Sequence, residues 1–364
     1  MTIKKRKKLL SPGACIGFLV FLLIFCIYIV SIFSEPFADF INGTVCSGYR
    51  FVMAKFGDLF PFSLYEFVLI TIPLQVIIFL WLAIRRFKSG EGRGRFVLNF
   101  LAAALALYSG HLLALGIGYN TTPVTDKLDI SEVEINENNL SDTLIYLRED
   151  INGLSAEIKL NDAGISESGY TLDEISARIC LAYTDFSAKE GFPMSFDSKA
   201  KGITFSRAMS YFSLMGIYTF YTGEANVNML YPDFDIVFSA AHELSHQRGI
   251  SREDEANFMA YLVLSRSADP YLRYSAALSA YGYVGAALYK TNPEKYFEIN
   301  SSLSKTAVAD LTESNRISGK YGDTVFSDIS RFVNDLFLKS GGTEGVVSYG
   351  MVTRHIVAYL APKI

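Results

Sequence analysis

Residues 233–263 read DFDIVFSAAHELSHQRGISREDEANFMAYLV, and this stretch decides how the second half of the chain folds. Pro232 comes just before it and is a typical start signal for a helix. Gly249 can end that helix by adopting a left-handed conformation. Ser251 and Asp254 then resemble a capping box that opens another helix. The stretch therefore predicts two helices joined by a tight turn, with the second helix returning beside the end of the first.

The first of these helices carries the pattern His-Glu-x-x-His at residues 242–246. On a helix, His242 and His246 lie one turn apart on the same face, where both imidazoles can reach one Zn²⁺ ion. Glu243 projects beside them and is placed to take a proton from a water molecule that zinc acidifies. With four histidines in 364 residues, chance would give this pattern in only about a few chains per thousand. The alternative is a helix that merely carries two histidines with satisfied hydrogen bonds near a surface.

The second helix has one buried stripe, defined by Phe258, Met259, Leu262 and Val263. At the helical rotation of about 100° per residue, Glu255 falls on the axis of that stripe. A carboxylate that points into an apolar face is costly unless it is paired, and a metal ion would pair with it. Glu255 is therefore the expected third ligand, and the fourth position is left for water, as a catalytic site requires. The alternative is a first-turn acid that complements the helix dipole, a role that Glu253 and Asp254 fill equally well.

Three uncharged runs in the first third of the chain predict membrane-spanning helices. They cover residues 9–34, 67–84 and 96–119, and each is long enough to cross a hydrocarbon core of about 30 Å. Half of all residues are hydrophobic. A cleaved signal peptide would begin in a similar way, but its apolar region would usually be only about 7 to 15 residues long. We therefore expect residues 1–119 to form a membrane domain in contact with the lipid bilayer.

The Lys and Arg residues of short loops predict the orientation, because they resist translocation. They cluster in the N-terminal tail and at residues 85–95, whereas the loop between the first and second runs holds only Arg50 and Lys55. Both basic segments therefore belong in the cytoplasm. Three crossings from a cytoplasmic N-terminus place residues 120–364 outside. We expect a multi-pass protein of the cell membrane with an extracytoplasmic main domain.

The main domain is expected to be α+β, mostly helical with a small sheet. Residues 276–289 and 329–338 are typical of helices, and residues 215–230 are typical of a β-strand that runs into a loop. Within that strand, residues 217–221 would hold an extended substrate if they lie at a sheet edge. An ordinary core strand is the equal alternative. Whether the acid-rich segment 126–174 masks a cleft as a prosegment is left open.

Several polar side chains are candidates for substrate binding, namely Tyr221, Glu224, Asn226, Asn228 and Tyr349. Glu224, Asn226 and Asn228 alternate along the polar run that follows the strand. They could equally well line a cleft or satisfy the hydrogen bonds of a turn. A residue that stabilises the oxyanion is expected to be His, Tyr or Arg. Spacing does not select among its candidates, which are Tyr221, Tyr349, Arg354 and His355. His111 is expected to pack among the membrane helices rather than bind a metal.

Charge and cysteine content exclude two classes of protein. The net charge is −4, and the basic residues form no stripe interleaved with aromatics, so we do not expect nucleic-acid binding. Four cysteines in a chain of this length do not make a disulfide framework. Cys46 and Cys180 lie outside the apolar runs, and their pairing is left open. The expected partner is a peptide or protein substrate, and the sequence does not define the oligomeric state.

Short strings spread along nearly the whole chain resemble one family of bacterial membrane proteins. The strings are Pro61-Phe62-Ser63, TGEANVN at 222–228, HELSHQRG at 242–249, REDEANF at 252–258, Asn334-Asp335 and Ser348-Tyr349-Gly350. They resemble the domain-of-unknown-function 3810 family, which looks like a branch of the zincin-like peptidases. The segment Glu255-Ala256-Asn257 is similar to the third-ligand segment of other small gluzincins, and this resemblance implies Glu255 as a metal ligand. One departure is 218–221, where the family pattern has Pro-Phe before Thr-Gly-Glu.

These observations predict a membrane-anchored zinc metallopeptidase with a zincin-like domain, which hydrolyses peptide bonds outside the cytoplasmic membrane. The alternative from another class is a catalytically silent zincin-like sensor or binding module. A protease that acts within the membrane is disfavoured. The charged residues that flank the motif leave no spanning run around it; they are Asp233, Asp235, Arg248 and Arg252.

Overall fold

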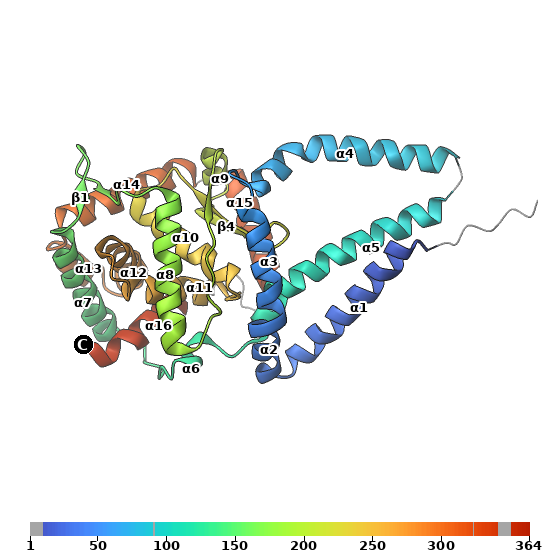
Figure 1. Cartoon of the computed structure of the whole chain (residues 1–364). Helices are drawn as coiled ribbons and strands as arrows, with labels where there is room; N and C mark the ends of the chain where they lie inside the picture. Colours follow the sequence, from blue (N-terminus) through green and yellow to red (C-terminus); the bar gives the residue numbers. More distant parts are fainter. Residues whose placement is uncertain (1–9, 90–91, 323, 341–350) are drawn as a thin grey trace, which may run out of the picture.

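The computed structural model describes residues 10–89, 92–322, 324–340 and 351–364. Within them the chain is mostly helical and has two small sheets. Three long helices extend from one side of a helical domain that holds the rest of the chain (Figure 1). This arrangement confirms a mostly helical protein with a small sheet and three apolar N-terminal helices.

The three long helices are α1 (Pro12–Ile32), α4 (Leu64–Ser89) and α5 (Arg93–His111). The third continues through η2 (Leu112–Gly116) and η3 (Ile117–Asn120). Each is long and apolar enough to cross a membrane, and together they confirm the three apolar helices predicted from the uncharged runs. Helix α1 packs along α5, whereas α4 diverges from both (Figure 1).

The segment between α1 and α4 is helical as well, which the sequence did not predict. It consists of α2 (Glu35–Ile41), η1 (Asn42–Cys46) and α3 (Ser47–Asp58). Ala38, Ile41 and Cys46 are buried together with Ile117 of η3, so this segment packs on the inner end of the third long helix. It lies across the junction between the long helices and the main domain (Figure 1).

The core of the main domain is built by helices packed on α12 (Pro270–Thr291). The others in it are α7 (Glu137–Ser155), α8 (Leu172–Glu190), α10 (Asp233–Gln247), α11 (Glu253–Ser265) and α16 (Met351–Leu360). Helix α12 contains the predicted helix 276–289. Helix α7 buries Leu144 and Ile151 in this core. Because the segment 126–174 contributes core residues, it is an integral part of the domain rather than a detachable prosegment.

Further elements lie around this core. They are α6 (Val124–Lys127), α9 (Ser206–Tyr211), α13 (Pro293–Asn300), α14 (Lys305–Tyr321), α15 (Val325–Ser340), η5 (Ala361–Lys363) and the two-stranded sheet of β1 (Lys159–Leu160) and β2 (Ser166–Glu167). The predicted helix 329–338 falls inside α15.

The sheet beside α10 has three strands in the order β3-β5-β4. Strand β3 (Ala200–Ile203) runs parallel to β5 (Glu224–Asn228), and β4 (Gly216–Thr219) runs antiparallel to it. Strands β4 and β5 form a hairpin, with Gly223 at a φ of 71° in the turn. The predicted strand in 215–230 is therefore a hairpin, and its first strand lies at the sheet edge.

Candidate metal centre

Helix α10 is the element that carries the His-Glu-x-x-His pattern, and it is buried on almost every face. Asp233 and Asp235 lie in its first turn, where a negative charge favours the start of a helix. Apolar side chains such as Phe234, Val237 and Leu244 are buried around it. It packs against β4 and β5 on one side and against α11 and α12 on the other. The two histidines are thus held on a rigid, enclosed helix.

A tight turn after α10 brings α11 back beside the histidines. Gly249 has a φ of 96°, a left-handed conformation that favours glycine, as predicted. A Cβ at this position would lie 2.6 Å from Cζ of the buried Arg50, so no larger residue fits. The predicted capping box is wrong, because Arg252 is the N-cap of α11 and has no capping side chain. Ser251 instead donates its hydroxyl to the carbonyl of Leu115 at 2.8 Å.

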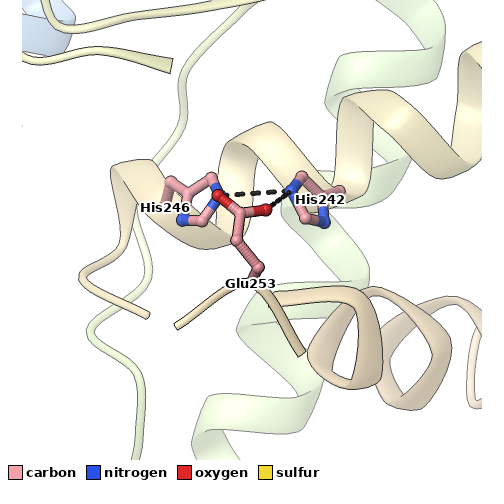
Figure 2. A group of neighbouring side chains, drawn as sticks. All are labelled: His242, His246 and Glu253. Atoms are coloured by element: carbon pink, nitrogen blue, oxygen red, sulfur yellow. Dashed lines mark hydrogen bonds and ion pairs between the residues drawn. The ribbon is translucent and has the colours of Figure 1, made fainter. Parts of the chain in front are cut away.

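Three side chains converge where the turn closes: His242, His246 and Glu253 (Figure 2). The two Nε2 atoms lie 3.1 Å apart. Oε2 of Glu253 lies 3.2 Å from Nε2 of His242, and Oε1 lies 3.5 Å from Nε2 of His246. All of the potential ligand atoms lie within 4.8 Å of one another.

This geometry fits a divalent ion of the zinc type. Zinc bonds of about 2.0 to 2.2 Å in a tetrahedral arrangement place neighbouring ligand atoms about 3.3 Å apart. The separations of 3.1, 3.2 and 3.5 Å lie around that value. Two imidazoles and one carboxylate are also a donor set that zinc takes in catalytic sites. His242, His246 and Glu253 are therefore the residues that would hold the ion.

The prediction of Glu255 as the third member of this group is corrected by the structure. Glu255 is buried, as predicted, but its Oε1 accepts hydrogen bonds from the backbone N–H of Val124 at 3.0 Å and from Arg252 at 2.9 Å. A guanidinium and an N–H group thus compensate the buried charge of Glu255 in this structure. Glu253, at the first residue of α11, is the acid that reaches the histidines.

The second histidine is oriented by the turn. Nδ1 of His246 lies 2.7 Å from the carbonyl oxygen of Ile250, which assigns a proton to Nδ1, so that in the neutral imidazole Nε2 carries the lone pair that could bind a metal. Burial acts to lower the pKa of His246, but the Glu253 carboxylate outweighs it and raises that pKa to about 9. Conversely, burial opposes ionisation of Glu253, and the two imidazoles outweigh burial and lower its pKa. Nδ1 of His242 has no hydrogen-bond partner among the described residues.

Glu243 lies next to the edge strand. The backbone N–H of Tyr218 in β4 donates to its carboxylate, and Gly216 approaches so closely that an added Cβ would lie 2.7 Å from Cγ of Glu243. Burial raises the pKa of Glu243 to about 7, while the charges of His242 and His246 oppose the rise. The carboxyl group therefore changes protonation near neutral pH, as a general acid-base requires. Sequence patterns did not reveal Gly216 or Tyr218, because their role depends on packing between strand and helix.

The predicted polar run on β5 has a structural role. Glu224 accepts hydrogen bonds from the backbone N–H groups of Leu64 and Tyr65, at 2.9 Å each. Asn226 accepts a hydrogen bond from the Ser63 hydroxyl at 2.6 Å, and Asn228 donates to the Leu214 carbonyl at 2.9 Å. These hydrogen bonds connect the sheet to the start of α4 and to the residue Leu214 that precedes β4. All three side chains therefore have hydrogen-bond partners within the fold, and their role in substrate binding stays a prediction.

The remaining predicted side chains are dispersed. Tyr221 lies in the β4–β5 turn. His355 of α16 lies 3.1 Å from Oδ2 of Asp254, Arg354 is exposed, and Tyr349 lies outside the described residues. His355 is not part of the cluster of three.

The two cysteines outside the apolar runs do not pair. Cys46 and Cys180 are both free and buried. Cys180 instead donates to the Ser198 carbonyl at 3.3 Å. A disulfide therefore has no part in positioning the metal centre.

Comparison with known proteins identifies a family of unknown function. No curated protein and no solved structure matches the chain. The family described as Protein of unknown function (DUF3810) matches residues 41–357, which include most of the inner helical segment, the sheet and the candidate metal centre. With most of its length matched, the chain belongs to this family, as its sequence strings predicted.

Proposed function

We propose that this protein is a zinc-dependent metallopeptidase anchored in the membrane, with a zincin-like catalytic domain. The observation that carries the proposal is the convergence of His242, His246 and Glu253 at zinc-ligand spacing, with Glu243 one residue away on the same helix. The family match adds no activity to this argument.

The residues of the site divide the work of peptide hydrolysis. Bound zinc would polarise the scissile carbonyl and acidify a water molecule. Glu243, with a pKa of about 7, is placed to accept the proton that the water gives up and to return it to the leaving nitrogen. The N–H of Tyr218 keeps the Glu243 carboxylate in position.

The edge strand β4 offers a way to hold the substrate. One side of β4 pairs with β5, and among the described residues no strand pairs with its other side. An extended peptide can add to such an edge through main-chain hydrogen bonds. Because Gly216 and Tyr218 contact Glu243, a peptide on β4 would lie alongside the proton carrier.

The proposed location follows from the basic loops. The three long helices would cross the cell membrane, with the basic N-terminal tail and the basic 85–95 loop in the cytoplasm. The metal centre would then lie on the extracytoplasmic side, in a position to meet peptide or protein substrates there.

The test combines metal analysis with a peptide-library assay on the full chain purified in detergent. We expect about one zinc ion per chain, cleavage that stops with a chelator, and no cleavage by Glu243→Gln. Glu243→Gln keeps the ligands, so retention of zinc by this variant would show that its fold is intact. Bound zinc without any cleavage would favour the silent sensor or binding module. A wild-type protein that binds no zinc would contradict both the peptidase and the silent zincin-like module.

A further inference from the structure

The helical segment before α4 has an exposed apolar face that no part of the described chain covers. Val45, Val52, Phe56 and Leu59 are 50, 61, 49 and 75% exposed. Their spacing of seven, four and three residues places them on one side of a helix. Apolar patches of this kind on a soluble surface mark contact with a protein or a membrane.

Apart from the exposed Glu35 at the start of α2, the charged side chains of this segment are buried or bonded to the main domain. Among residues 36–60, all of which the structure describes, no exposed residue is charged. Arg50 is buried. The three others bond to the main domain: Asp39 to Lys127 at 2.7 Å, Lys55 to the Asp197 carbonyl at 2.6 Å, and Asp58 to the backbone N–H of Lys199 at 3.2 Å. The outer face of α3 is therefore mainly apolar, and its most exposed charge, Lys55 with a side chain 43% exposed, is bonded to the main domain.

The position of α3 identifies what covers this face. The segment starts three residues after α1 ends, and α4 starts six residues after α3 ends, so both neighbours are candidate membrane spans. Helix α3 runs across the ends of the long helices (Figure 1). An apolar face continuous with two spanning helices fits the boundary between lipid headgroups and acyl chains.

The hairpin that carries the edge strand rests on these membrane elements. The ring of Phe220 packs on His111 of α5 with centroids 5.3 Å apart, and its carbonyl accepts a hydrogen bond from Tyr49 of α3 at 3.4 Å. A Cβ on Gly223 would lie 2.6 Å from Cβ of Met53, so the turn touches α3 directly. Phe220 is only two residues, or about 7 Å along an extended chain, from Tyr218, which contacts Glu243.

The turn between His246 and Glu253 is fixed to the same elements. Asn42 of η1 donates to the carbonyl of Gly249 at 3.1 Å. Arg252 donates to the carbonyl of Tyr119, in the extension of α5, at 2.7 Å. The metal centre is thus held against the inner ends of the membrane helices from both of its sides.

We propose that α3 lies in the bilayer surface and that the site acts on membrane-anchored polypeptides, within the first residues that leave the membrane. The choice of substrate rests on the proposed peptidase function, whereas the position of α3 does not. A site this close to the lipid surface reaches a tethered chain near its anchor.

Quenching of tryptophan fluorescence by brominated lipids tests the position of α3. Trp81 is the single tryptophan, so Trp81→Phe gives a dark background for Phe56→Trp, with Leu59→Trp as a second reporter. The control is Phe297→Trp on α13, which is 58% exposed and lies on the far side of the main domain (Figure 1). In lipid nanodiscs brominated near the headgroups, we expect the α3 reporters to lose about half of their intensity and the control almost none. Equal quenching of reporters and control would overturn the position.

Anchored peptides test the substrate class. Two palmitoylated peptide pools in liposomes with the zinc-loaded protein would carry a random stretch of about ten residues, which spans about 33 Å when extended. In one pool the stretch follows the lipid directly, and in the other it follows a Gly-Ser spacer of about twenty residues. Both pools are equally concentrated at the membrane, so we expect about tenfold more chelator-sensitive cleavage in the first. Equal cleavage, or a preference for the second pool, would overturn the substrate class. No cleavage of these or of soluble peptides would defeat the peptidase proposal, while the quenching result would still decide the position of α3.

Discussion

A buried acid from a neighbouring helix lies near each end of α10, Asp310 of α14 near its start and Glu253 of α11 near its end, but the surroundings of the two acids differ in kind. Near its start, the fully buried Asp310 accepts hydrogen bonds from the backbone N–H of Ser166 at 2.8 Å and from the Tyr274 hydroxyl at 2.7 Å. Near its end, Glu253 faces two imidazole nitrogens. Asp310 thus accepts hydrogen bonds from two donors, whereas Glu253 lies beside imidazole nitrogens that carry lone pairs when the imidazoles are neutral.

This difference separates a structural acid from a candidate metal ligand. A buried carboxylate that receives donors from the fold is already compensated. Lone pairs that converge on one point repel one another unless a proton or a cation lies between them. Without a metal, the elevated pKa of His246 and the lowered pKa of Glu253 describe an ion pair held by a proton. Zinc binding would displace that proton.

The largest expected effect distinguishes the two acids of α11. Glu253→Gln should weaken zinc binding by about a hundredfold or more, since it removes a charged ligand. Glu255→Gln should leave zinc affinity nearly unchanged, because its partners are Arg252 and the N–H of Val124. It should instead lower the free energy of unfolding by about 1 to 2 kcal/mol. Competition with a chromophoric chelator measures affinity, and thermal unfolding in detergent measures stability.

These substitutions form a matched pair, because both replace a buried glutamate by its isosteric amide on the same helix. A loss of zinc in Glu255→Gln with full affinity in Glu253→Gln would reverse the assignment and restore the sequence prediction. If both variants keep wild-type affinity, the cluster beside α10 is no metal centre.

The sequence was sufficient for features that depend on local pattern. The uncharged runs predicted the three apolar helices, and the spacing of His242 and His246 predicted one shared helical face. Gly249 was predicted to end α10 in a left-handed conformation, and it does. In each case neighbouring residues along the chain determine the outcome.

Features that depend on distant partners were not accessible. Burial of Glu255 was predicted correctly, but the N–H that compensates it belongs to Val124, 131 positions away. Helix α3 was not predicted, because its charged residues Arg50, Lys55 and Asp58 are typical of a loop between two membrane spans. Only the fold shows that these charges turn to the main domain and leave an apolar face outside.

The next effect concerns the other end of α10 and depends on pH. Burial raises the pKa of Asp235 to about 7, the Asp310 charge adds to the rise, and a hydrogen bond with Ser314 opposes it. The folded state therefore holds this proton more tightly than the unfolded chain. Its stabilising contribution is complete below about pH 4, the unfolded pKa, and is lost as pH rises towards 7.

Asp235→Asn should flatten this pH dependence, since the amide resembles the neutral acid. Relative to the variant, the wild type should lose about 2 to 4 kcal/mol of unfolding free energy between pH 4 and pH 7. Thermal unfolding of the metal-free protein at several pH values measures the difference. A variant that tracks the wild type at every pH would show that Asp235 ionises freely, and that the polar network here is more open to water than its burial indicates.

The smallest expected effect concerns the contact between the edge strand and the proton carrier. In Gly216→Ala, the added methyl group must displace the Glu243 carboxylate, while the zinc ligands stay in place. Misplacement of a proton carrier by a fraction of an ångström costs about tenfold in rate, or about 1.4 kcal/mol. We expect kcat to fall by that factor with zinc content unchanged. Gly282→Ala on α12 is the control, because its Cβ would meet nothing within 4 Å, and it should keep the full rate. A Gly216→Ala protein that cleaves as fast as the control would mean that Glu243 moves freely, and that its bond to Tyr218 does not position it for catalysis.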